Sequence, residues 1–280
     1  MKVMSHDFST RNDLVGLARL TRSLHAVARP MEIEYFLMGA AARDLMLRYA
    51  HNIDASRATE DADFAVMVRG WDEYQKLREG LIASGDFAPR PGPATHRLRH
   101  RESLPLDIVP YGGVERRDRT IAWPGSEKGV VFDCFGMREA SQSTVEVRLP
   151  EDVQLRVGSI PALAILKIAA WNDRKHTHPG RDASDLLLFA RSYMDCDNFD
   201  RLISHHGDLL ESGDFDHVEA GARLLARDLK QLLAPDAVDR VLTILLPEAD
   251  EAGRLLLAHQ SGMELELARR LLEVMCEELP

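Results

Sequence analysis

Apolar residues near the start of the chain recur at steps of three and four. Within residues 8–29 they lie on one face of a helix, which is typical of an amphipathic α-helix. These residues are Leu14, Leu17, Leu20, Leu24 and Val27. The apolar segment 33–38 then ends at Gly39 and precedes strong helix formers over 40–49. This order predicts a helix, a strand, a tight glycine turn and a second helix.

Short apolar segments dominate the next hundred residues. Residues 62–68 have a β-like pattern, and residues 71–82 have a helical one, with Tyr74, Leu77 and Leu81 on one side. Further strands are predicted at 94–100, 104–110, 129–134, 143–149 and 153–157. Most prolines and glycines lie in the loops between these segments. The predicted strands therefore crowd into the first 157 residues.

The pattern changes after Gly158. Ser159 and Pro161 form a helix-start signal before a long apolar run, and the sequence beyond Asp182 alternates helical patterns with short polar breaks. No internal repeat is evident. We therefore expect a mixed α/β domain at residues 1–157 and a helical domain at residues 158–280.

The composition is that of an ordinary soluble protein. The chain has 280 residues, 45% hydrophobic content and a net charge of −10, which excludes a disordered or membrane-embedded class. Residues 1–11 are too polar for a secretory signal, and Lys167 interrupts the most apolar later stretch, so we expect neither export nor a membrane span. Three widely separated cysteines suit a reducing cytoplasm, where we expect the protein to reside. They are Cys134, Cys196 and Cys276.

The negative charge is unevenly distributed. Residues 195–280 carry 19 acids and 8 bases, or −11, which leaves 26 acids and 27 bases, or +1, for residues 1–194. Between Arg90 and Arg119 there are seven arginines against four acids, with Tyr111 nearby. This strip could contact the phosphates of RNA, or it could be a set of charges at a sheet edge. The net charge therefore does not exclude a nucleic-acid partner.

Carboxylates gather around the predicted strand 62–68. Asp61 and Asp63 are two residues apart, so on a strand they point to the same face. Ala62 and Phe64 then face the opposite way, into the core. The alternation of acid and apolar residues predicts one charged face and one buried face.

A third acid, Asp107, lies among apolar residues in the predicted strand 104–110, where a lone carboxylate is costly. Two carboxylates about 4 Å apart repel by about 4 kcal/mol at an effective dielectric near 20, so three together need a cation or a shared proton. Mg²⁺, with Mn²⁺ as the alternative ion, meets this need with oxygen ligands. In the alternative interpretation, Asp61 and Asp63 are solvated, and Asp107 pairs with one of three nearby arginines. These are Arg97, Arg99 and Arg101.

The small residues after the predicted strand 33–38 suggest a second element of the site. In Gly39–Asp44 the backbone N–H groups could cradle a triphosphate at the start of a helix. The alternative is close packing of a helix on the sheet, with Arg43 and Asp44 exposed and Asp44 paired with Arg48.

These segments together resemble a known family. The glycine turn at 39–44, the paired acids at 59–64 and the third acid at 106–109 resemble, in this order, the polymerase-β-like nucleotidyltransferase superfamily. The closer resemblance is to AbiEii-type nucleotidyltransferases, toxins of type IV toxin–antitoxin systems, and it extends to Lys167 and the segment 181–186. It implies an α+β fold, with a mixed sheet flanked by helices and followed by a C-terminal helical domain. Ala40 departs from the Ser or Gly that is frequent in the superfamily.

The resemblance also implies a role for each site residue. Asp61 and Asp63 would hold Mg²⁺ on the triphosphate, and Asp107 would complete a second metal site and activate the attacking hydroxyl. Lys167 would neutralise charge on the phosphates, and Asp182 would act with it in catalysis. The implied nucleotide-binding residues are Gly39, Ala40, Arg43, Thr59 and Lys167.

Other interpretations of the later residues stay open at this level. Lys167 could instead extend its side chain from an apolar helix toward solvent, and Asp182 could cap a helix. Asp185 would support that helix start or pair with Arg181. The pair His176 and His178 lacks a third ligand at a useful spacing, so a solvent-facing loop is favoured over a zinc site.

The implied activity is transfer of a nucleoside monophosphate from an NTP to a hydroxyl acceptor, with release of pyrophosphate. A tRNA is the candidate acceptor and a cognate antitoxin the candidate partner, with no membrane involved. The alternatives are a catalytically silent nucleotide-binding or partner module, an antibiotic-modifying nucleotidyltransferase, and a metal-dependent phosphohydrolase.

Overall fold

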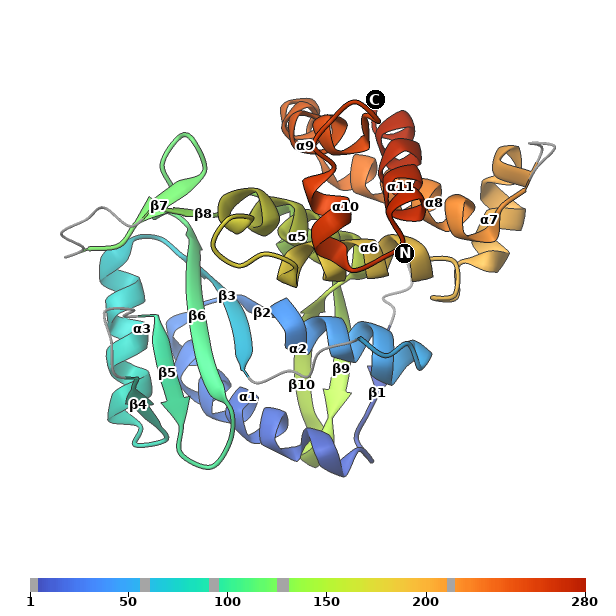
Figure 1. The fold of residues 1–280 in the computed structure, drawn as a ribbon. Coiled ribbons are helices and arrows are strands. Elements are labelled where there is room, and N and C mark those ends of the chain that lie inside the picture. Colours follow the sequence, from blue (N-terminus) through green and yellow to red (C-terminus); the bar gives the residue numbers. More distant parts are fainter. Residues whose placement is uncertain (1–4, 56–60, 91–95, 125–130, 211–214) are drawn as a thin grey trace. The chain divides into compact units, whose positions relative to one another are not determined.

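The computed structural model describes residues 5–55, 61–90, 96–124, 131–210 and 215–280. The chain forms two units (Figure 1). The first comprises residues 1–45 and 56–159, and the second comprises residues 46–55 and 160–280. The division after Ser159 lies two residues beyond the expected one, and the short segment 46–55 belongs with the helical part.

An eight-stranded mixed sheet forms the centre of the first unit. Its strand order is β1-β9-β10-β2-β3-β6-β5-β4, and Figure 1 shows β2, β3 and β6 side by side. The strands are β1 (Ser5–Asp7), β2 (Tyr35–Met38), β3 (Ala62–Val68), β4 (Phe87–Pro89), β5 (Arg97–His100), β6 (Pro105–Gly112), β9 (Thr144–Leu149) and β10 (Val153–Gly158). A separate antiparallel pair is made by β7 (Thr120–Ala122) and β8 (Val131–Asp133). The expected mixed sheet is confirmed.

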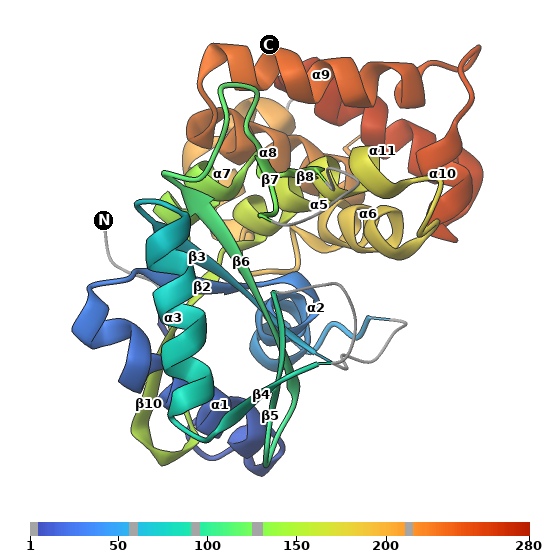
Figure 2. The same cartoon turned by 90° about the vertical axis from the view of Figure 1, so that its left-hand side faces the viewer.

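In the part of the first unit that the structure describes, four α-helices accompany this sheet. They are α1 (Val15–Ala28), α2 (Gly39–Asp44), α3 (Trp71–Ala83) and α4 (Met137–Gln142). Helices α1 and α3 contact each other, and Figure 2 shows α3 lying along the sheet. The helices expected within residues 8–29 and at residues 71–82 are confirmed as α1 and α3. Helix α2 follows β2 directly and continues as a π-helical turn at Leu45–Tyr49. The short elements β1, β4, β7 and α4 were not predicted.

The two faces of β3 differ at positions 63 and 67 but not at position 65, because Ala65 is completely buried. Ala62, Phe64 and Val66 are completely buried, whereas Met67 is 47% exposed. This alternation confirms that Ala62 and Phe64 enter the core, because successive side chains of a strand point to opposite faces. Asp63 consequently shares the less covered face with Met67.

The second unit is helical. Its helices are α5 (Ile160–Arg174), α6 (Arg181–Ser192), α7 (Phe199–His205), α8 (His217–Leu232), α9 (Pro235–Ala249), α10 (Leu256–Ser261) and α11 (Leu265–Glu278). Helix α5 packs on α6, and α11 packs on both α8 and α9. The Asp216 side chain caps α8 by accepting hydrogen bonds from the backbone N–H groups of Val218 and Glu219. None of the helices in the described ranges is long and apolar enough to cross a membrane.

The buried face of β3 should dominate the stability of the first unit. We expect Phe64→Ala to lower the free energy of unfolding by about 3–5 kcal/mol, the usual cost of removing a buried phenyl ring. Met67→Ala, on the opposite face of the same strand, should cost less than about 0.5 kcal/mol. Urea unfolding of both variants measures the difference, and similar losses would contradict this assignment of the faces.

Candidate active site

A row of charged side chains crosses the sheet at one level. Asp63 of β3 lies opposite Asp107 of the parallel strand β6, and Asp107 lies opposite Arg97 of the antiparallel strand β5. Residues directly opposite one another on neighbouring strands project to the same face. We call Asp63, Asp107 and Arg97 the charged row. It brings together two of the three predicted acids and one of the three arginines considered as partners.

The third predicted acid lies next to this row. Asp61 precedes Asp63 by two residues, just before β3 begins, and it is partly buried. Burial raises the pKa of Asp107 most, the Arg97 guanidinium lowers it, and the Asp61 carboxylate raises it again; the net pKa is raised. The electrostatic influence of Asp61 on Asp107 indicates that these two carboxylates lie near each other.

The two oxygens of Asp107 have different environments. Oδ2 lies 3.3 Å from Nε of Arg97 in an ion pair, so the pairing with an arginine that the sequence left open is confirmed for Arg97. Oδ1 is buried and has no hydrogen-bond partner among the described residues. Buried polar atoms are nearly always satisfied, so this oxygen marks a position where a ligand is expected.

Gly39 is explained by the carboxylate of Asp63. The glycine has a φ of +71°, which is strained for any residue with a side chain. A Cβ at this position would lie only 2.1 Å from Oδ2 of Asp63. The carboxylate therefore lies against the glycine backbone, in space that a side chain would fill. The residue at this turn must be a glycine because the Asp63 carboxylate occupies the space of a side chain, and this requirement holds whether or not the turn also binds a phosphate.

The other predicted nucleotide ligands are less accessible. Ala40 is buried, and Arg43 is completely buried and donates hydrogen bonds from Nε and Nη2 to Oδ1 of Asp44 at 2.8 and 2.6 Å. The expectation of an exposed Arg43 in the close-packing alternative is therefore wrong. Contact between Arg43 and a nucleotide stays a prediction that requires this side chain to leave its buried position. Thr59 lies outside the described residues.

The donor set suits a hard divalent cation. Asp61, Asp63 and Asp107 offer only carboxylate oxygens, which Mg²⁺ and Mn²⁺ prefer, and Oδ1 of Asp107 lacks a partner within the described ranges. In those same ranges no three His, Cys, Asp or Glu side chains are gathered closely enough to enclose an ion. The residues fit the metal if their side chains turn toward a common point. Arg97 now supplies the positive charge at Asp107.

A second charged cluster lies inside the helical unit. Nζ of Lys167 on α5 lies 2.6 Å from Oδ2 of Asp185 and 3.1 Å from Oδ1 of Asp182, both on α6. Arg174 donates to both oxygens of Asp182, at 2.6 and 2.9 Å. Lys167, Asp182 and Asp185 are all at least 90% buried. Two cations and two carboxylates thus compensate one another across the contact between α5 and α6.

This cluster corrects three interpretations of the sequence. Lys167 does not extend into solvent, and Asp182 does not cap α6, because Gly180 occupies the cap position without a side-chain hydrogen bond. Asp185 pairs with Lys167, which replaces the expected contact with Arg181. Burial alone would raise the pKa of Asp182, but Arg174 and Lys167 outweigh it, and the net pKa is lowered. The catalytic roles of Lys167 and Asp182 stay predictions.

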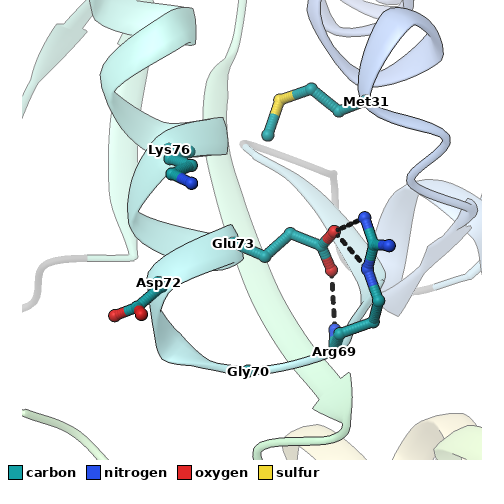
Figure 3. Close-up of a pocket in the computed structure, with 6 residues that line it drawn as sticks. All are labelled: Met31, Arg69, Gly70, Asp72, Glu73 and Lys76. Atoms are coloured by element: carbon teal, nitrogen blue, oxygen red, sulfur yellow. Dashed lines mark hydrogen bonds and ion pairs between the residues drawn. The ribbon is translucent and has the colours of Figure 1, made fainter.

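A surface pocket lies at the other end of β3. Its lining is Met31, Arg69, Gly70, Asp72, Glu73 and Lys76. Figure 3 shows the Arg69 side chain turned to Glu73, and its Nε donates to Oε1 at 2.8 Å. Arg69 follows the last residue of β3, whereas Asp61 precedes the first, so this pocket is separate from the charged row. Its central charges already satisfy one another.

Two predicted histidines and two arginines complete the comparison between the sequence and the structure. His176 and His178 are exposed in the turn before α6, which confirms a solvent-facing loop. Sequence reasoning missed Arg174, although its position seven residues after Lys167 on the same helix was a usable signal. Arg97 was considered as a partner of Asp107 and as one of the seven arginines that could contact RNA phosphates.

The match of a family model shows that the protein is a nucleotidyltransferase. The family model of the AbiEii nucleotidyltransferase toxins of type IV toxin–antitoxin systems matches residues 24–252, and the chain belongs to this family. No curated protein matches the chain.

Several solved structures are similar to this chain. An antigenic nucleotidyltransferase-like protein from Paracoccidioides brasiliensis shares 16% identity over 73% of this chain and 93% of its own, with a TM-score of 0.43. The antibiotic-resistance factor ANT(2'')-Ia shares 13% identity over 70% of this chain and 95% of its own, with a TM-score of 0.36. The Thermotoga maritima CCA-adding enzyme, complexed with tRNA, shares 14% identity over 93% and 80%, with a TM-score of 0.24.

Removing the charge of Asp107 should not destabilise the protein at neutral pH. Folding raises the pKa of this carboxyl above its ordinary value of 3.8, so the ionised form costs stability once the pH exceeds that value. We expect Asp107→Asn to be at least as stable as the wild type at pH 7.5, and the difference to shrink toward pH 4.5. Arg97 loses its partner at little cost because it is 48% exposed. Thermal unfolding across this range, with exposed Asp72→Asn as the control, measures the effect; a pH-independent loss would contradict it.

Breaking the buried cluster should be costly. Lys167→Met leaves two buried carboxylates with one fewer cation, and we expect it to lower the free energy of unfolding by about 3–5 kcal/mol. The same change at exposed Lys230 should stay within about 0.5 kcal/mol. Chemical denaturation compares the two, and a tolerated Lys167→Met would show that the cluster is not a structural unit.

Proposed function

We propose that the protein is a magnesium-dependent nucleotidyltransferase that transfers a nucleoside monophosphate from an NTP to a hydroxyl group of RNA. The observation that carries this proposal is the register of the charged row, which places Asp63 and Asp107 side by side with Asp61 adjacent. Membership of the AbiEii family supports nucleotidyl transfer as the reaction. Mg²⁺, with Mn²⁺ as a substitute, is the proposed metal.

The roles follow from the chemistry of in-line displacement at phosphorus. Asp61 and Asp63 would hold the metal, with Asp107 completing the ligand set, and the bound metal would neutralise charge on the triphosphate. The acceptor oxygen forms a bond to the α-phosphorus, and the bond from that phosphorus to the pyrophosphate oxygen breaks. Asp107 takes the hydroxyl proton, and pyrophosphate leaves. Gly39, which has no side chain, leaves room for the Asp63 carboxylate against its backbone.

The arginine strip of the first unit supports RNA as the acceptor. Arg101 is exposed just after β5, and Arg116 and Arg117 are exposed after β6. In contrast, Arg97 is held by Asp107 at 3.3 Å, and Arg119 is held by Glu115 at 2.6 Å and by Glu139 at 3.1 Å, so neither belongs to the proposed RNA-binding surface. Exposed guanidinium groups bind phosphates in a salt-dependent manner. We therefore place the RNA backbone along this strip, with a tRNA end as the proposed acceptor.

The family membership supports a toxin role for this activity. AbiEii proteins are toxins of type IV toxin–antitoxin systems, and modification of RNA would act on the translation machinery. We therefore propose a cognate antitoxin as the physiological partner.

Labelling with NTPs tests the proposed reaction. The protein is incubated with each α-³²P-labelled NTP, Mg²⁺ and total RNA, and label is expected in RNA together with released pyrophosphate. Asp61→Asn, Asp63→Asn and Asp107→Asn should each lower the rate by about 10²–10⁴-fold, because each removes a metal ligand or the proton acceptor. The matched control Asp72→Asn, an exposed acid of the separate pocket, should keep wild-type activity.

Other outcomes identify the alternatives. Free nucleoside monophosphate or phosphate without labelled RNA would indicate a phosphohydrolase, and label only on an added aminoglycoside would indicate an antibiotic-modifying enzyme. NTP binding without any transfer would indicate a silent module. RNA labelling that does not fall as salt rises would contradict the proposed role of the arginine strip.

A further inference from the structure

We propose that Arg97 couples metal binding to nucleotide binding by exchanging partners. In the ligand-free protein its guanidinium pairs with Asp107, and when the metal takes Asp107, Arg97 moves to a phosphate of the nucleotide. This inference rests on the proposed function. It assigns to Arg97 a positioning role that the three acids alone do not supply.

Arg97 lies next to Asp107 in the charged row. Asp107 has one strand neighbour on each side: Asp63 on β3 and Arg97 on β5. With Asp61 nearby, Asp107 belongs to a group of like charges on one side and pairs with a cation on the other. Arg97 therefore occupies the electrostatic place of a metal ion. A cation at this place must compete with Arg97 for the same carboxylate.

Arg97 and Asp107 differ in burial. The side chain of Asp107 is 8% exposed, whereas that of Arg97 is 48% exposed. The arginine can thus leave toward solvent while the carboxylate stays in place. Oδ1 of Asp107 is buried and has no partner among the described residues, so Arg97 holds this carboxylate through Oδ2 alone. Arg97 can therefore be displaced from Asp107 without any movement of the carboxylate.

The exchange also balances the charges of the metal ion, Arg97 and the triphosphate. A divalent ion that displaces Arg97 brings two positive charges to Asp107. It also frees the positive charge of the Arg97 guanidinium from that carboxylate. The released guanidinium projects from the same face of the sheet as the acids, where a triphosphate would lie, and guanidinium groups bind phosphate oxygens in bidentate geometry. Without nucleotide the exchange leaves Arg97 unpaired; with nucleotide both cations find anions. Metal and NTP should therefore strengthen each other's binding through Arg97.

Arg99 provides a matched control on the same strand. It is exposed and projects from the same face two residues further on, but its partner in register is Pro105 in place of an acid. Arg99→Gln removes the same charge from the same surface without touching Asp107. A difference between the two variants therefore reports on the pairing with Asp107.

Binding of Mn²⁺, followed by electron paramagnetic resonance, tests the exchange without catalysis. Wild type, Arg97→Gln and Arg99→Gln are titrated with Mn²⁺, with and without an α,β-methylene ATP analogue. We expect Arg97→Gln to bind Mn²⁺ alone at least about fivefold more tightly than the wild type, and the tightening caused by the analogue to be reduced at least about fivefold. Arg99→Gln should match the wild type in both measurements, and Arg97→Lys, which keeps a charge, should lie between.

The opposite results overturn the inference. Unchanged or weaker binding of Mn²⁺ alone to Arg97→Gln, or an equal effect in Arg99→Gln, would show that Arg97 does not compete with the metal. If the wild type transfers nucleotide and binds Mn²⁺ while Arg97→Gln behaves identically, the exchange fails and the proposed function stands. If the wild type binds no Mn²⁺ even with the analogue, the proposed function itself fails.

Discussion

The register of β6 between its two neighbours is the constraint on which the candidate site depends. It places Asp107 opposite Asp63 on one side and opposite Arg97 on the other. Because side chains alternate between the faces of a strand, a slip of one residue would move Asp107 to the buried face that Leu106 and Ile108 occupy. The apolar residues that flank Asp107, Leu106 and Ile108, are completely buried and hold this register. The core of the sheet thereby fixes the geometry of the charges.

The two units compensate their buried charges differently. In the helical unit, Lys167 and Arg174 balance Asp182 and Asp185, and the cluster joins α5 to α6. In the first unit, Arg97 pairs with Oδ2 of Asp107, whereas Oδ1 of this buried carboxylate has no partner among the described residues. Incomplete compensation costs stability and is characteristic of binding sites. The first unit therefore offers a place for an added cation, whereas the Lys167 cluster already has its own.

Much of the fold and part of the site could be predicted from the sequence. Alternation along β3 identified its buried face, and apolar neighbours placed Asp107 inside a strand. The partner of Asp107 could not be chosen, because Arg97, Arg99 and Arg101 share one strand period and only the register distinguishes them. Burial of Arg43 and the pairing of Lys167 with Asp185 depend on packing between separate segments, which local patterns do not report. Elements of three to six residues, such as β1 and α4, are too short to show a period.

The most direct test of the account is a crystal structure with Mn²⁺ and the α,β-methylene ATP analogue, in which anomalous scattering locates the metal. The account predicts a peak bound by Asp61, Asp63 and Oδ1 of Asp107, with the Arg97 guanidinium detached from Asp107 and within hydrogen-bond distance of a phosphate. A nucleotide bound elsewhere, with no metal at these acids and the pair between Arg97 and Asp107 intact, would contradict it.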